Sequence, residues 1–178
     1  MVDWKPVTRI LPPMNEAEWI EEFEKYKSYP EFQIKNFDFS LQDYKQIYWW
    51  EYIHRLLGRF IGIVFFIPFL FFWIKRRFEK RFLKKLWLLL GLGASLGIIG
   101  WLMVKSGLNE RPDVSHYMLA LHLFMAFTTF GYTLWLALSQ AYANTFIGIR
   151  FKIVKRLLRL LIFLTLLQVV YGAFVAGL

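Results

Sequence analysis

The sequence has no cysteine, which excludes disulfide bridges, thiolate metal ligands and iron–sulfur clusters. It also lacks the ligand spacing of zinc sites, a phosphate-binding loop and a set of residues that would form a Ser–His–Asp triad. The net charge is +9, but the basic residues are strongly segregated along the chain. This distribution argues against a general nucleic-acid surface, and no nucleic-acid partner is expected.

Apolar and aromatic side chains are abundant instead. Hydrophobic residues make up 57% of the 178 positions, with 19 Phe, 8 Trp and 9 Tyr. A soluble domain of this size rarely carries so much apolar content, whereas a membrane protein does. A helix needs about 20 apolar residues to cross a lipid bilayer. Four runs reach that length and predict an all-α, polytopic membrane helix bundle with four transmembrane helices: about 56–74, 86–104, 118–138 and 160–178.

Basic residues flank these runs unevenly, and the asymmetry predicts the orientation. The link between the first two runs, residues 75–85, holds seven Lys or Arg, and the link before the fourth run is also basic. Short loops rich in Lys and Arg stay on the cytoplasmic side. We therefore expect a multi-pass protein of the inner (cell) membrane. Its N-terminal segment and its C-terminus would lie on the outer, periplasmic side.

Residues 1–53 form a predicted outer helical segment, and residues 54–178 form the predicted four-helix bundle. Met14 to Tyr29 has the pattern of an amphipathic helix, with Asn15 in position to cap it. Three aromatic residues share one stripe of this helix: Trp19, Phe23 and Tyr26. A second helix is expected from Leu41 to His54, leading into the first span.

Two histidines lie at matching depth in the predicted bundle, His54 at the mouth of the first run and His122 just inside the third. Ionisable side chains in a bilayer are costly and indicate functional sites. Both runs start outside, so the two helices are parallel, and facing imidazoles can bind haem iron from both sides. The alternatives are an interfacial His54 without a ligand and a His122 bonded to a backbone carbonyl. His116 is expected to be a solvated loop residue.

The residues around His54 fit the same haem site. Gly58 lies one turn along the same helix face, where the absence of a side chain lets a flat macrocycle approach the backbone. Arg55 and Arg59 offer planar cationic donors to haem propionates. Glu51 offers a carboxylate for proton handling or for stabilising a cation. The alternative is a simple helical ion pair between Glu51 and Arg55, with the arginines anchored at the membrane interface.

Small residues recur along the second predicted span at steps of four and three: Gly93, Gly97 and Gly100. This spacing is typical of a helix-packing face in a membrane. No strand precedes the glycines, so a dinucleotide-binding turn is much less favoured.

Several motifs, in the correct order, resemble one family. The segment Glu51-Tyr52-Ile53-His54-Arg55 looks like the Glu-x-x-His-Arg motif of haem A synthases of the alphaproteobacterial and mitochondrial type. Four other segments resemble the first outer loop and later helices of that family: residues 3–26, 100–108, 119–123 and 171–178. The resemblance therefore covers nearly the whole chain.

The resemblance implies an activity and a site. Haem A synthases oxidise the C8 methyl of haem O to a formyl group, which gives haem A for terminal oxidase assembly. They have eight transmembrane helices in two similar halves, each with a histidine pair facing haem. In this chain the first pair would be His54 and His122, the ligands of the haem iron. Glu51 would be the catalytic glutamate, and a haem b in the other half would relay electrons. The sequence does not identify the electron donor.

The chain also departs from the family pattern. Leu96 and Met118 stand where the family usually has Gln and Arg. The chain corresponds to helices two to five, so a second chain or a missing half would carry the other histidine pair. The lack of a signal peptide and the abrupt apolar end at Leu178 favour the same interpretation, part of a larger protein. Two other functions stay open: a bis-histidine haem-binding subunit for electron transfer, and an inactive fragment without haem.

Overall fold

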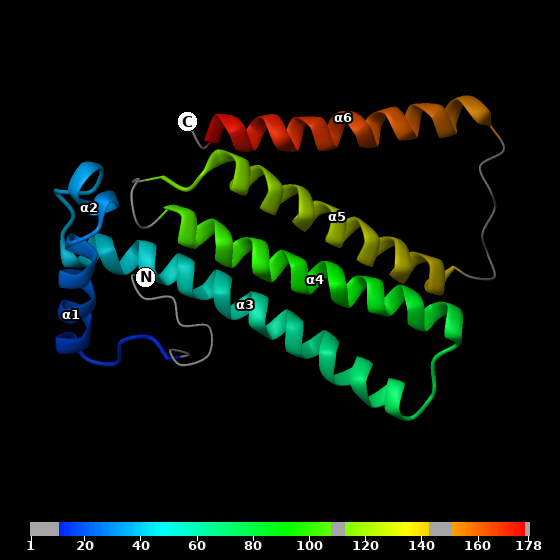
Figure 1. Ribbon diagram of the computed structural model, residues 1–178, viewed down its shortest axis with the longest axis horizontal. Coiled ribbons are helices and arrows are strands. Elements are labelled where there is room, and N and C mark those ends of the chain that lie inside the picture. Colours follow the sequence, from blue (N-terminus) through cyan, green and yellow to red (C-terminus); the bar gives the residue numbers. More distant parts are fainter. Residues whose placement is uncertain (1–10, 108–112, 143–150, 177–178) are drawn as a thin grey trace. The chain divides into compact units, whose positions relative to one another are not determined.

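The structure is a computed structural model that describes residues 11–107, 113–142 and 151–176. Their regular secondary structure is helical throughout, which confirms the all-α prediction. The helices are α1 (Glu16–Lys27), α2 (Pro30–Ile34), α3 (Leu41–Ile74), α4 (Lys80–Gly107), α5 (His116–Ala141) and α6 (Lys152–Ala176) (Figure 1). Residues 3–10 of the first-loop resemblance and Leu178 lie outside the described residues.

Four of the helices, α3 to α6, are long and apolar enough to cross a membrane. The described part of each predicted span lies within one of them, so the chain is a membrane-spanning protein. The helices extend beyond the apolar runs: α4 begins at Lys80 and α6 at Lys152, so part of each basic link is helical. Helical structure satisfies the backbone near the bilayer, while long Lys and Arg side chains reach water from the helix ends.

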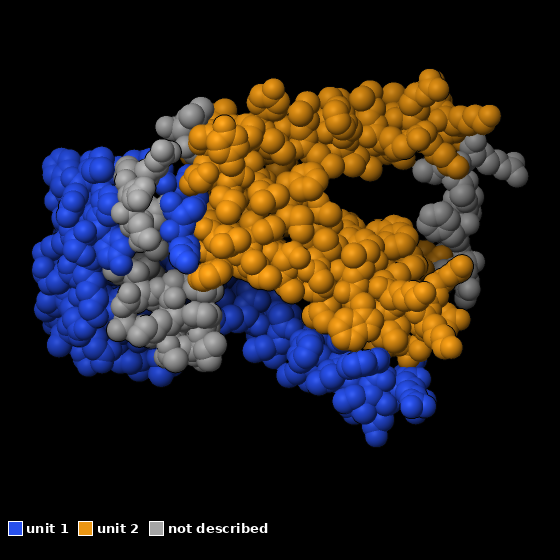
Figure 2. All heavy atoms as spheres, in the orientation of Figure 1, with its two compact units in different colours: residues 1–77, 104–114 blue, residues 78–103, 115–178 orange. Residues whose placement is uncertain are grey.

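The chain divides into two compact units, coloured separately in Figure 2. Unit 1 consists of Met1–Arg77 and Val104–Val114, and it contains α1, α2 and α3. Unit 2 consists of Phe78–Met103 and Ser115–Leu178, and it contains most of α4 with α5 and α6. His54 belongs to unit 1 and His122 to unit 2.

Local capping interactions fix where the helices of unit 1 begin. The side chain of Asn15 accepts a hydrogen bond from the backbone N–H of Glu18 at 2.9 Å, as the sequence predicts. Ser40 and Asp43 form a reciprocal capping box at the start of α3. From this cap α3 continues for 34 residues, so the helix predicted for 41–54 and the first span are one element.

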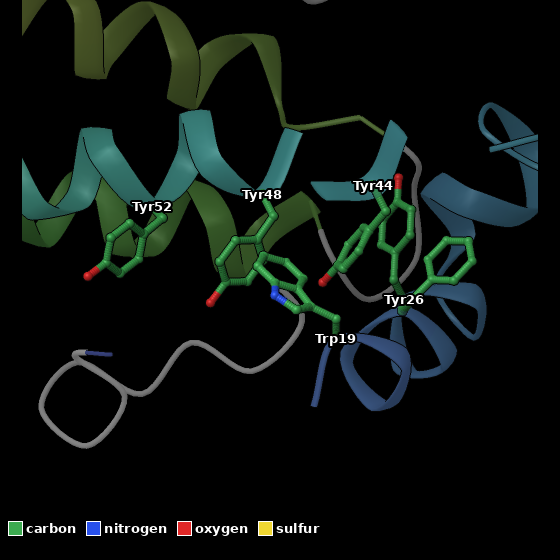
Figure 3. Close-up of a cluster of buried hydrophobic side chains, with 6 residues drawn as sticks. Trp19, Tyr26, Tyr44, Tyr48 and Tyr52 are labelled. Carbon is green, nitrogen blue, oxygen red and sulfur yellow. The ribbon is translucent and has the colours of Figure 1, made fainter. Parts of the chain in front are cut away.

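An aromatic cluster forms the core of unit 1: Trp19, Phe23 and Tyr26 of α1 with Tyr44, Tyr48 and Tyr52 of α3. Figure 3 shows the tyrosines of α3 in a row beside Trp19 and Tyr26. The Tyr26 and Tyr44 rings stack with centroids 4.9 Å apart, and Trp19 meets Tyr48 edge-on at 4.9 Å. Each set follows the helical repeat, so two aromatic stripes bury one another and hold α1 against the N-terminal part of α3.

Unit 2 is built from antiparallel neighbours. Near the start of α4, the Tyr132 hydroxyl of α5 donates to the Lys85 carbonyl at 3.3 Å, and the Lys85 ammonium lies 4.8 Å from the Trp135 ring centroid. At the other end of α5, Tyr117 packs against Phe174 of α6 with ring centroids 5.6 Å apart. From this contact α6 diverges from α5, and the space-filling view shows an opening between the two helices (Figure 2).

Candidate functional site

The candidate site residues of α3, from Glu51 to Arg59, lie within just over two helical turns, and two of them interact directly. Arg55 donates to the carboxylate of Glu51, four residues earlier. The ion pair that the sequence offered as the alternative to a propionate-binding role for Arg55 is therefore present. The Arg55 side chain keeps only 12% of its surface exposed, so the pair is more shielded from water than a typical surface pair. The pair thereby restricts the position of the guanidinium beside His54.

The opposite sides of α3 have different surroundings at this level. Tyr52 is buried in the aromatic cluster, whereas His54 is exposed. Two residues along a helix correspond to about 200° of rotation, so these two side chains leave opposite faces. A methyl group added at Gly58 or Gly62 would meet nothing within 4 Å. The space beside Gly58 and Gly62, which follow His54 at steps of four along α3, is therefore open.

His122 has different surroundings, because α5 places it against a glycine of α4. The side chain is half-buried, and its ring edge faces Gly100. A Cβ atom at Gly100 would lie 2.9 Å from Cε1, 3.4 Å from Nδ1 and 3.8 Å from Nε2 of His122. Because Gly100 has no side chain, the edge of the imidazole ring can occupy the space beside it.

The prediction that His116 is a solvated loop residue is wrong. His116 is the first residue of α5 and is half-buried. Its ring lies 4.2 Å from the Tyr117 ring and 5.8 Å from the Phe174 ring, measured between centroids. The contact with Phe174 joins positions far apart in the sequence, so local pattern could not reveal it. His116 is a packing residue of unit 2.

The structure thus groups the α3 residues on one helix and places His122 beside Gly100. Neither unit, in its described part, contains a group of three or more His, Asp or Glu side chains that could hold a metal ion. Haem iron needs fewer protein ligands, because the macrocycle supplies the other nitrogens, and His54 and His122 would be the residues that hold it. The donor chemistry and the open glycine face beside His54 are compatible with haem.

Comparison with known proteins assigns the family. The whole chain, residues 1–178, matches the family of cytochrome oxidase assembly proteins designated COX15-CtaA. The chain belongs to this family. Its motif order, which resembles haem A synthases, and its apolar helices agree with this membership.

Relatives in the family bear one name. The chain is 51% identical over 183 residues to a haem A synthase of Flavobacterium psychrophilum and 47% identical over 180 residues to one of Flavobacterium johnsoniae. It is 44% identical over 180 residues to a haem A synthase of Parvibaculum lavamentivorans. These alignments cover 99–100% of the chain but only 51–52% of each relative. The chain therefore spans about half the length of the curated relatives it matches. No solved structure matches it.

The sequence patterns indicate Glu51, His54 and Arg55, but two other parts of this region were not predicted: the tyrosines of α3 and Glu31 of α2. The tyrosine stripe of α3 carried a detectable signal, since the three residues recur every fourth position. Glu31 of α2 had no such signal. Burial raises the pKa of Glu31, the negative charge of Glu51 raises it further, and Lys35 opposes the shift. Lys35 itself forms an ion pair with Asp113. The charge of Glu51 in α3 thus acts on Tyr26 of α1 and on Glu31 of α2, so side chains from all three helices of unit 1 lie near this carboxylate.

Proposed function

We propose that this chain is the part of a haem A synthase that binds haem O and takes part in oxidising its C8 methyl group to a formyl group. The observation that carries the proposal is the 51% identity to a haem A synthase across the whole chain. The geometry supports it, because the Glu51-x-x-His54-Arg55 motif lies on α3 with its histidine on an open face. Since the chain spans about half of its relatives, the complete enzyme would include further helices.

In this proposal His54 and His122 would be the two histidines that hold the iron of the substrate haem. Bound haem supplies the redox-active iron and the methyl group that is oxidised. Gly58, one turn from His54, leaves the α3 backbone accessible to the face of a flat ligand. His122 would approach from α5, with its ring orientation restricted by α4. We assign haem O, the substrate, to this histidine pair. Haem b would belong to the missing half.

The charged residues of α3 would orient the substrate and accept protons. Arg55 and Arg59 carry planar guanidinium groups, which suit the carboxylates of haem propionates. Glu51 pairs with Arg55. Conversion of a methyl group to a formyl group with oxygen from water releases protons and electrons. Glu51 would accept a proton or stabilise positive charge, and the electrons would pass through haem iron to an acceptor outside this chain, such as a haem of the other half. The ion pair would thus link Arg55, which binds the propionate, to Glu51, which accepts the proton.

The histidine assignment is tested by haem content. His54→Ala and His122→Ala should each lower the affinity for haem by at least the 10- to 100-fold expected from loss of a ligand-supporting group. His116→Ala is the matched control, because this third histidine packs against Tyr117 and Phe174. Each variant is purified from membranes and its haem is quantified by absorbance and extraction. Unchanged haem content in both His54→Ala and His122→Ala contradicts the assignment.

The role of Glu51 is tested by product analysis. Glu51→Ala should keep bound haem but form no formyl product, because the proton acceptor is lost while both imidazoles remain. Extracted haem is identified by mass spectrometry after incubation with haem O. Glu79→Ala, an exposed carboxylate at the start of α4, is the control. Full product formation by Glu51→Ala removes the glutamate from the mechanism.

A second candidate function is electron transfer by a bis-histidine haem subunit. The observation that favours it is the half-length coverage, since the chain contains one of the two histidine pairs that the resemblance implies. In that case the binding of haem b would require both His54 and His122. Haem O would then remain unconverted even when the partner half is supplied, and Glu51→Ala would leave the redox behaviour unchanged.

A further inference from the structure

Gly100 is in direct contact with the ring of His122, whereas Gly91, Gly93 and Gly97 of the same helix have no such neighbour. The Cβ position at Gly100 lies 2.9 Å from Cε1 of the imidazole, a separation that real Cβ atoms essentially never show. A Cβ atom placed in the same way at Gly91, Gly93 or Gly97 has no neighbouring atom within 4 Å. The glycine stripe of α4 therefore contains one position where the His122 ring fills the space beside the glycine, and three where that space is open.

We propose that Gly100 is a positioning residue, which sets the ring orientation of His122 for haem binding. This inference rests on the proposed function, because it assigns a role toward the ligand that His122 would bind. The edge of the ring that faces Gly100 carries both nitrogens, with Cε1 between them closest to the glycine. Any group added there displaces the part of the imidazole that binds iron.

The physical consequence of a side chain at position 100 is a rotation of His122. The imidazole is the far end of a side chain with two rotatable bonds, so it can turn away from an added methyl group while α4 and α5 stay packed. The contacts of Lys85 with Tyr132 and Trp135 secure the other end of the two helices. Gly100→Ala should therefore keep the fold and change the direction in which the imidazole presents its nitrogens. Iron binding would depend on that direction, because the residues of a binding site must be held close to the productive geometry.

The experiment compares three identical substitutions on one helix. Gly100→Ala, Gly97→Ala and Gly93→Ala are purified from membranes and reconstituted with haem b, which serves as the probe. Electron paramagnetic resonance measures the fraction of ferric haem in the low-spin, six-coordinate state, and titration measures the haem affinity. We expect Gly100→Ala to lose most of the low-spin signal and to bind haem about tenfold more weakly. The two control variants should match the parent protein.

A double variant separates positioning from general damage. In the His122→Ala background the added methyl has no ring to displace, so Gly100→Ala should have no further effect on spectrum or affinity. A Gly100→Ala effect equal to that of Gly97→Ala overturns the positioning role. The role is also overturned if the Gly100→Ala protein fails to accumulate in membranes and the additional substitution His122→Ala does not restore its accumulation. If His122→Ala itself leaves the low-spin signal intact, the proposed ligand fails, which is a different result from failure of Gly100 alone.

Discussion

At the residue scale, the buried tyrosines of unit 1 differ in how their hydroxyl groups are satisfied. The Tyr26 hydroxyl accepts a hydrogen bond from Nδ2 of Asn36 at 2.7 Å. Tyr44 is completely buried, and its hydroxyl has no hydrogen-bond partner in the part of the chain that the structure describes. A buried polar group without a partner costs about 1–3 kcal/mol. The aromatic cluster therefore contains one tyrosine whose hydroxyl supports the packing and one whose hydroxyl opposes it.

This difference predicts opposite effects of the same substitution. Tyr44→Phe should raise the free energy of opening α1 by about 1 kcal/mol, because it removes an unsatisfied hydroxyl and keeps the ring. Tyr26→Phe should lower it by about 1 kcal/mol, because the bond from Asn36 is lost. Amide hydrogen exchange of α1 measures both. A Tyr44→Phe protein that opens as easily as Tyr26→Phe would show that the Tyr44 hydroxyl is satisfied.

At the element scale, α1 and α2 show what local sequence can and cannot specify. Asn15, the acidic first turn and the aromatic stripe are all local signals, and α1 begins directly after its predicted cap. The short helix α2 was not predicted, although Pro30 occupies its first turn, where proline is favoured. Five residues are too few to show a helical repeat. This helix carries Glu31, so the missed element also concealed a residue close to the candidate site.

The raised pKa of Glu31 predicts a pH dependence for this element. The folded state holds the Glu31 proton more tightly than the unfolded state, because burial raises its pKa above the ordinary value of 4.5. The corresponding stability is present in full below pH 4.5 and is lost as the pH rises through the raised pKa. The opening free energy of α1 and α2 should therefore fall as the pH rises from 4.5, which hydrogen exchange corrected for intrinsic rates can follow. Glu31→Gln should flatten this profile, and an equally steep profile in that variant assigns the effect to another group.

At the scale of the whole molecule, the distribution of basic residues around four long helices predicts the membrane orientation. The absence of cysteine makes this simple to test, since a single introduced cysteine is the only thiol. Met14→Cys, at an exposed position before α1, should react with a membrane-impermeant maleimide in intact spheroplasts. Lys80→Cys, at the start of α4, should react only after the membrane is permeabilised. The reverse pattern would place the N-terminal segment in the cytoplasm and contradict the orientation.

The sequence by itself determined the features that depend on neighbouring residues. Apolar runs of sufficient length specified α3 to α6, because a helix that crosses a bilayer must satisfy its own backbone. The spacing of Glu51 and Arg55 specified their ion pair, because positions four apart share a helix face. The family resemblance also came from the sequence alone, because it depends on which motifs are present and on their order along the chain.

Only the tertiary structure decided which faces meet. The tyrosine stripe of α3 receives the aromatic stripe of α1, His116 packs on Phe174, and the imidazole of His122 fills the space left by Gly100. Each contact joins residues well separated along the chain. Helical periodicity shows that a face is apolar or small, but the fit of side-chain shapes selects its partner. Gly100 therefore had the sequence signature of a packing residue, and the contact with His122 alone distinguishes it from the glycines beside it.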